Sequence, residues 1–296
     1  MMCCALWGSA FPFVKIGFEL FDIGGPGSQI LFAGIRFFLA GILTLGIACF
    51  LQKGFARPKR EVIPGICGQG LLQTTGQYVC FYTGLANCTG AKGSVMSGTT
   101  AFFAILAAHF MTKDEKLTTR KVLGCLVGFL GVIVVNLAPG SLEGGFALSG
   151  EGLVLLSAVF YGISSVTLKR LSARETPEVI TAYQLLFGGA VLILVGWISG
   201  GRITTVTPRG LLVLFYLALL STIAFTVWSF LLKYNPVSKV SIFSFSIPVF
   251  GVALSAIFLG EQVFTIQNLA GLALVGIGIV VVNTVSSCKG QPDSVQ

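Results

Sequence analysis

Two basic residues within otherwise apolar runs are the charged side chains of this sequence that could do chemistry. Lys15 and Arg36 lie inside such runs, whereas all 11 acidic residues fall at the ends of runs or between them. An ionisable group inside a bilayer is costly and is therefore a functional candidate. Arg36 or Lys15 could attract an anionic or zwitterionic solute, or each could extend its charge to the membrane interface. The sequence leaves both interpretations open.

A stripe of amides forms a second candidate group. Gln69, Gln73 and Gln77 recur at every fourth residue, which places them on one face of a helix. Such a stripe either forms hydrogen bonds between helices or lines a cavity, and its spacing does not decide between these alternatives. The neighbouring Tyr78 and Tyr82 are compatible with a cavity.

A third group lies in two apolar runs that small and polar residues interrupt, at 97–100 and 244–248. Pro248 removes a backbone donor and frees a carbonyl one turn earlier. Interrupted helices at corresponding positions of two halves indicate the binding site in secondary transporters, although a kink needed only for packing would give the same pattern. The candidates in these runs are Thr99, Ser244, Ser246 and Pro248.

Aromatic residues and one histidine complete the candidates. Trp7, Tyr161 and Trp228 could form walls of the same cavity, or they could serve packing and interface anchoring. His109, the single histidine, suits an interfacial position better than a proton relay. Because the sequence shows no phosphate-binding loop, no Ser-His-Asp set and no metal-ligand cluster, we expect no enzyme, no cofactor and no metal site.

The composition requires a membrane around these residues. The chain of 296 residues is 54% hydrophobic and 10% charged, whereas soluble domains carry about 25% charged residues. Because a spanning helix uses about 20 apolar residues, the apolar runs predict an all-α integral membrane protein with ten transmembrane helices. We place these helices at about 1–18, 29–51, 62–86, 93–112, 121–138, 151–169, 179–199, 210–232, 238–259 and 266–286.

Charge and cysteine placement narrow the partners to lipid and a solute. Most of the 19 Lys and Arg residues follow the even-numbered spans, and only Lys92, Arg202 and Arg209 lie in loops on the other side. The positive-inside rule then predicts that both termini are cytoplasmic, with either a very short lead before the first span or a start further upstream. The net charge of +8 is not arranged with interleaved aromatics, so nucleic acid is not an expected partner. The eight scattered cysteines are interpreted as small apolar residues.

An internal repeat divides the chain into two halves of five helices. Residues 92–136 align without gaps with 239–283, pairing Ser97 with Ser244. Trp7-Gly8 similarly aligns with Tyr161-Gly162, and Lys15 with Lys169. Since five is odd, the second half must enter the membrane from the opposite side, which is the inverted-repeat arrangement of secondary transporters. The predicted units are 1–138, 150–286 and a cytoplasmic tail, 287–296.

The sequence resembles the EamA family of the drug/metabolite transporter superfamily. The residues that carry the resemblance are Leu6-Trp7-Gly8-Ser9, Arg36-Phe37, Asp114-Glu115, Asn235-Pro236, Pro248 and Leu259-Gly260-Glu261. The resemblance implies ten helices and a central cavity formed mainly by spans 1, 3, 4, 6, 8 and 9. It also implies export or import of small metabolites. The related small multidrug resistance family relies on a carboxylate in its first helix, and span 1 here has none, which disfavours a cationic-drug substrate.

We therefore expect a permease or exporter that moves a small metabolite, such as an amino acid or related solute, across the cell membrane by alternating access. The bacterial inner membrane is the expected location if the source is bacterial. The alternatives are a membrane-embedded enzyme and a multidrug exporter of the same superfamily. The small-residue face of Gly124, Gly128 and Gly131 predicts close helix packing, either between the halves or in a homodimer.

Overall fold

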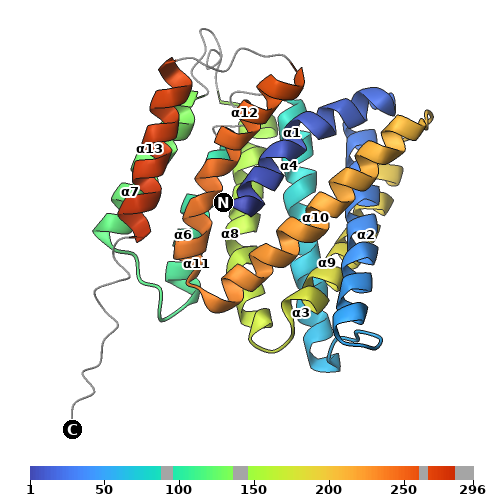
Figure 1. Cartoon of the computed structure of the whole chain (residues 1–296), viewed down its shortest axis with the longest axis horizontal. Helices are drawn as coiled ribbons and strands as arrows, with labels where there is room; N and C mark the ends of the chain where they lie inside the picture. Colours follow the sequence, from blue (N-terminus) through green and yellow to red (C-terminus); the bar gives the residue numbers. More distant parts are fainter. Residues whose placement is uncertain (88–95, 136–145, 260–265, 284–296) are drawn as a thin grey trace.

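The computed structural model describes residues 1–87, 96–135, 146–259 and 266–283, and throughout these ranges the chain forms helices and connecting turns without strands (Figure 1). The predicted all-α class is thereby confirmed for the described residues. The predicted tail 287–296, together with Cys88, Lys92 and Cys288, lies outside the described ranges.

The helices follow the predicted apolar runs closely. In the first half they are α1 (Met2–Leu20), α2 (Pro26–Leu51), η1 (Arg60–Val62), α3 (Ile63–Gln69), η2 (Gly70–Gly76), α4 (Gln77–Ala86), α6 (Thr100–Met111) and α7 (Thr119–Val135). In the second half they are η3 (Leu148–Gly152), α8 (Leu153–Ser172), α9 (Pro177–Ile198), α10 (Pro208–Tyr234), α11 (Val237–Ser241), η4 (Ile242–Phe245), α12 (Ser246–Leu259) and α13 (Ile266–Asn283).

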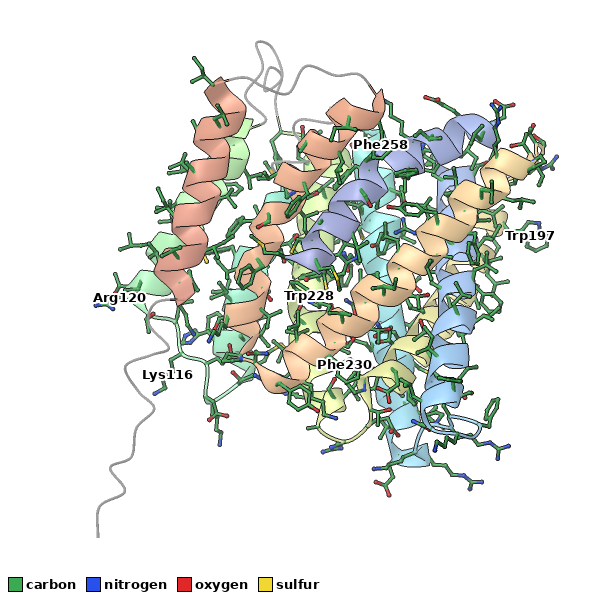
Figure 2. The ribbon with its side chains drawn as sticks, viewed as in Figure 1. Lys116, Arg120, Trp197, Trp228, Phe230 and Phe258 are labelled. Carbon is green, nitrogen blue, oxygen red and sulfur yellow. The ribbon has the colours of Figure 1, made fainter. Side chains whose placement is uncertain are left out.

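Prolines start several of the long helices. Pro26, Pro177 and Pro208 occupy the first positions of α2, α9 and α10, where the missing N–H has no partner to lose. Five helices among the described residues are long and apolar enough to cross a bilayer: α1, α2, Leu148–Ser172, α9 and α10. Their outer surfaces expose large apolar side chains such as Trp197, which is labelled in Figure 2, and Leu212; each is 70% exposed. A multi-pass membrane protein accounts for both properties.

Helices of the two halves pack against each other in matched pairs. The most extensive contacts join α2 to α9 and α7 to α13, and α7 and α13 stand together at one side of Figure 1. Around the centre, α1 packs on α12 and α10, while α8 packs on α6 and α4. In the sequence repeat, the α1–α12 contact corresponds to the α8–α6 contact, and the α1–α10 contact to the α8–α4 contact.

Close approaches of the backbone follow the same correspondence. A Cβ on Gly8 would lie 2.5 Å from the Cβ of Phe250, and one on Gly162 would lie 2.7 Å from the backbone of Phe103. Gly8 pairs with Gly162 in the sequence repeat, and Phe103 with Phe250. The two helix crossings, α1 with α12 and α8 with α6, therefore use equivalent residues.

The predicted glycine face of α7 packs within the chain. A Cβ on Gly124 would lie 3.0 Å from the carbonyl oxygen of Gly278, and one on Gly131 would lie 2.7 Å from that of Gly271. A Cβ on Gly128 would meet the ring of Phe245 at 2.8 Å. Of the two alternatives for this face, packing between the halves is the one that the structure shows.

The loops rich in Lys and Arg gather at one end of the bundle, here called the basic end. The loop after α2, the α6–α7 loop and the α8–α9 turn all lie toward the lower edge of Figure 1, and Lys116 and Arg120 lie in the same half in Figure 2. The end where α1 stops and α2 starts lies opposite, and is called the far end.

Candidate functional site

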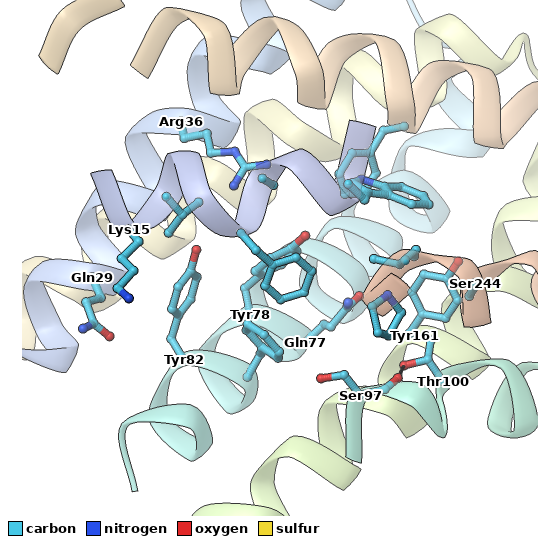
Figure 3. Close-up of a pocket in the computed structure, with 18 of the residues that line it drawn as sticks. Lys15, Gln29, Arg36, Gln77, Tyr78, Tyr82, Ser97, Thr100, Tyr161 and Ser244 are labelled. Carbon is cyan, nitrogen blue, oxygen red and sulfur yellow. Dashed lines mark hydrogen bonds between the residues drawn. The ribbon is translucent and has the colours of Figure 1, made fainter. Parts of the chain in front are cut away.

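A cavity of about 540 Å³ lies between the halves. Its wall is built from α1, α2, α4, the helix Met96–Met111, α8, α10 and the η4–α12 segment. Lys15, Gln29 and Tyr82 lie at one end of the cavity, and Tyr161 and Ser244 at the other (Figure 3). All six spans implied by the family resemblance contribute to the wall, and span 2 adds Gln29 and Arg36. Since Gln29 is in the first turn of α2, the cavity extends from the middle of the bundle toward the far end.

Most of the predicted binding residues meet at this cavity. Those that line it are Trp7, Arg36, Gln77, Tyr161, Ser244 and Pro248, together with Lys15. They come from both halves of the chain, and Trp7 and Tyr161 are a repeat-related pair. Ser97, the repeat counterpart of Ser244, also lines the cavity. Both members of each of these two pairs thus contribute to the wall of the same cavity.

The other four predicted residues lie outside the cavity lining. The Thr99 hydroxyl donates to the carbonyl oxygen of Met96 at 2.6 Å, where the helix is interrupted. Ser246 is 4% exposed and its hydroxyl contacts the sulfur of Met1 at 3.7 Å. In the segment Ser244–Pro248, it is Ser244, Ile247 and Pro248 that line the cavity, as positions separated by three and four residues share a helical face.

Trp228 forms a support behind the wall instead of lining it. Its side chain is 2% exposed, and its ring meets that of Trp7 edge-on with centroids 5.0 Å apart. Trp7, which does line the cavity, also packs edge-on against Phe225 with centroids 5.5 Å apart. These contacts fix the indole of Trp7 from behind, so Trp228 supports the cavity wall without lining it.

The amide stripe of span 3 is divided between the two roles that its spacing left open. The Gln69 amide nitrogen donates to the Gln73 side-chain oxygen at 2.8 Å and to the carbonyl oxygen of Ser164 on α8 at 3.1 Å. The hydroxyl of Thr167, also on α8, donates to the Gln69 side-chain oxygen. Gln69 therefore binds α8 and Gln73 binds Gln69, whereas Gln77 lines the cavity. A π-helical segment, η2, separates Gln69 from Gln77, and such segments often occur at functional sites.

The helix interruptions predicted in spans 4 and 9 both occur. The 3₁₀ segment η4 ends at Phe245, immediately before α12, and a turn at Thr99 interrupts the helix Met96–Met111. Ser97 and Thr100 on one side and Ser244 on the other line the cavity. Thus both interruptions lie beside the cavity, as the repeat predicts.

Arg36 is buried at the cavity with one side of its guanidinium engaged. The residue is 3% exposed, and its Nε–H donates to the Ser221 hydroxyl at 3.0 Å and the Leu217 carbonyl oxygen at 3.3 Å. Its Cζ lies 5.1 Å from the centroid of the Phe37 ring. This burial does not fit the interpretation in which Arg36 reaches the membrane interface. Arg36 lines the cavity together with Tyr82, which lies within hydrogen-bonding reach of the guanidinium.

Several polar atoms at the inner end of the cavity have no hydrogen-bond partner. Within the described parts of the chain they are Trp7 Nε1 and Gln77 Oε1, and beside them the hydroxyls of Tyr161 and Ser244 have no partner other than each other. Tyr161 and Ser244 are each 6% exposed, and both point into the region shown at the right of Figure 3. Unpaired buried polar groups are destabilising by about 1–3 kcal/mol each, so a solute that supplies partners would find them ready to bind.

The interior on the basic-end side of the cavity is filled. A cluster of buried apolar residues from both halves packs there, including Ile66, Leu168, Ile180, Trp228 and Val237. Beyond it, the Glu115 carboxylate joins the α6–α7 loop to α8 and α11. The Val237 and Ser238 N–H groups donate to Glu115 at 2.7 and 2.9 Å, and the Ser238 hydroxyl donates at 2.9 Å.

Lys169 completes this cluster of interactions. Its Nζ donates to Glu115 Oε1 at 3.1 Å and to the carbonyl oxygen of Asn235 at 2.9 Å. Burial raises the pKa of Glu115, but the hydrogen bonds from Ser238 and Val237 and the charge of Lys169 outweigh that effect and hold the pKa below its usual value of 4.5. Glu115 is therefore ionised at neutral pH.

His109 has a structural partner. Its Nδ1 accepts a hydrogen bond from the Leu117 N–H at 3.0 Å, which ties the last turn of α6 to the α6–α7 loop. The described cysteines are free thiols, in agreement with their interpretation as small apolar residues.

Sequence reasoning missed two kinds of site residue. Gln29 and Phe225 line the cavity, but each lies in a helix with no local pattern that distinguishes it. Ser221 holds Arg36 from α10, and Glu115 binds residues more than 50 positions away. Only the family resemblance drew attention to Glu115, through Asp114-Glu115, and it gave no partner.

Comparison with known proteins agrees with this architecture. The sequence model of the EamA-like transporter family matches the chain twice, over residues 1–137 and 148–284. The chain is 28% identical over 288 residues to "Uncharacterized transporter YvbV" of Bacillus subtilis, an alignment covering 96% of this chain and 90% of the relative. It is 27% identical over 281 residues to "Uncharacterized inner membrane transporter YedA" of Escherichia coli, covering 94% and 87%. A crystal structure with 22% sequence identity superposes with a TM-score of 0.76 over 94% of this chain and 97% of that one. With family matches that together span nearly its whole length, the chain belongs to the EamA-like transporter family.

Proposed function

We propose that the protein is a secondary transporter that moves a small metabolite, such as an amino acid or a related solute, through the central cavity by alternating access. The observation that carries this proposal is a cavity built by both halves that contains unpaired polar atoms and a buried arginine. The names of the relatives support transport rather than catalysis.

The inverted repeat supplies the means of alternation. Three observations support two equivalent halves of opposite orientation. They are the two family matches, the corresponding helix contacts of the two halves and the paired close approaches of Gly8 and Gly162. Two such halves can exchange conformations, so that a central site faces each side in turn. The described conformation has its cavity toward the far end and a filled basic end.

The positive-inside rule assigns the basic end to the cytoplasm. In that orientation the cavity extends toward the outside, and we expect both termini on the cytoplasmic side. A solute entering from the outside would pass Lys15 and Gln29 before it reached Arg36 and then Gln77. The basic end would have to open for the solute to reach the cytoplasm.

Flux through proteoliposomes tests the proposal. Thr100 lines the cavity, and Thr100→Trp should fill it and abolish uptake of any solute that the unmodified protein transports from a panel of amino and organic acids. Leu212→Trp is the matched control, because Leu212 is 70% exposed on α10 and its replacement should leave uptake intact. Uptake that persists in Thr100→Trp, with normal insertion, would contradict a route through this cavity.

A further inference from the structure

The charge of the cavity wall is positive without compensation. Lys15 and Arg36 line the cavity, and its described lining contains no Asp or Glu. Arg36 is 3% exposed and makes no ion pair within the described parts of the chain. A buried cation without a counter-ion is strongly destabilising, and an anion that entered the cavity would relieve this cost.

The orientation of Arg36 determines where an anion would bind. Its Nε–H is occupied by Ser221 and Leu217 on α10, which fixes the plane of the guanidinium. The hydroxyl-bearing rings of Tyr78 and Tyr82 line the cavity beside it (Figure 3). A planar fork of N–H donors matches the two oxygens of a carboxylate.

The remainder of the cavity is suited to an uncharged group. Beyond Arg36 the wall is formed by apolar surfaces such as Phe225 and Ile247, with neutral polar atoms of Gln77, Tyr161 and Ser244 between them. None of these side chains carries a negative charge that could pair with an ammonium group. The ammonium of an amino acid would enter a cavity that already contains two cations.

We propose that the site selects small organic acids with a net negative charge and an uncharged, largely apolar body, in preference to zwitterionic amino acids. The carboxylate would bind Arg36, and a hydroxyl or carbonyl group on the body would pair with the unpaired polar atoms. This inference rests on the proposed function for its site, and it narrows the solute class within it.

Three probes of similar shape but different net charge separate the effect of charge on binding from the effect of size. They are 2-hydroxy-4-methylpentanoate, which is an anion, leucine, which is a zwitterion, and leucinamide, which is a cation. Binding to the purified full chain is measured by ligand-induced thermal stabilisation. We expect the hydroxy acid to bind at least about tenfold more tightly than leucine, and leucinamide not to bind. Arg36→Gln should remove the preference, and Arg36→Lys should keep part of it.

The outcomes distinguish this inference from the proposed function. Leucine binding as tightly as the hydroxy acid, or a preference that survives in Arg36→Gln, would overturn the selection of anions. Failure of all three probes to bind would overturn it as well. If proteoliposomes take up leucine but not the hydroxy acid, transport stands and the anion preference fails. If the hydroxy acid binds through Arg36 but is never transported, the anion site stands and transport fails.

Discussion

Glu115 and Lys169 join the two halves of the chain at the basic end, with Nζ of Lys169 3.1 Å from Oε1 of Glu115. Glu115 is 7% exposed, and the Lys169 side chain is 31% exposed. The pair links the α6–α7 loop of the first half to α8 of the second, and the same carboxylate binds the start of α11. These elements must separate if the basic end is to open.

Removal of the lysine should leave an uncompensated carboxylate. We expect Lys169→Met to destabilise the protein by about 1–2 kcal/mol, less than the full effect of breaking a buried pair because Lys169 is partly exposed. Thermal unfolding in detergent measures this change. A matched control is Lys233→Met, because Lys233 lies on the same end in the last turn of α10 without a described ion pair. Equal unfolding temperatures for the two variants would contradict the expectation.

The contribution of Glu115 should depend on pH. Since its folded pKa is below 4.5, the carboxylate stabilises the protein above its unfolded pKa, and this stabilisation is lost as the pH falls through the folded pKa. We expect the unmodified protein to be more stable than Glu115→Gln at pH 7, with the difference shrinking below about pH 5. Thermal unfolding of both proteins across this range provides the measurement. A difference that does not change with pH would refute the role of the ionised form.

The position of Arg36 should depend on Ser221. Ser221→Ala removes the closer of the two Nε–H acceptors. Loss of this hydrogen bond should weaken the positioning of the guanidinium by about 1 kcal/mol. We expect about a fivefold weaker binding of 2-hydroxy-4-methylpentanoate, with little change in leucinamide binding and normal folding. Calorimetric titration of the purified variant measures this. If Ser221→Ala weakened all ligands equally, Ser221 would act on the shape of the cavity and not through Arg36.

The contact between α7 and α13 should not tolerate a methyl group. Gly131→Ala would place a Cβ 2.7 Å from the Gly271 carbonyl oxygen, whereas a Cβ on Gly46 of α2 meets nothing within 4 Å. We expect Gly131→Ala to lower the unfolding temperature, and Gly46→Ala to raise or maintain it, because alanine is the better helix former by about 1 kcal/mol. The opposite order of stabilities would show that the two helices separate easily.

Sequence patterns predicted the helices well and the site partly. Apolar runs and the repeat located the helices to within a few residues, because membrane spans need long uncharged segments. Trp7, Tyr161 and Ser244, which these patterns predicted as binding residues, line one cavity. Periodicity could not show which amides line the cavity and which form hydrogen bonds within the bundle. Gln73 and Gln77 follow the same spacing, but their environments differ along the length of span 3. Nor could it identify the hydrogen-bond partners of Arg36 and Lys169. These partners, Ser221 and Glu115, are distant in the sequence, and tertiary packing brings them into contact.

The π-helical segment η2 has a consequence for how this chain tolerates insertions and deletions. A π-helical turn holds one residue more than an α-helical turn, so loss of a single residue from Gly70–Gly76 could leave a continuous α-helix. Because the wider turn absorbs the extra residue, the residues after it would keep nearly the same direction around the helix axis, whereas a deletion in α-helical backbone would rotate them by about 100°. Gln77, Tyr78 and Tyr82, which line the cavity, would therefore keep facing it after a deletion in Gly70–Gly76 but not after one in α3. The π-helical segment is thus the place where span 3 can lose a residue without turning its polar side chains away from the cavity.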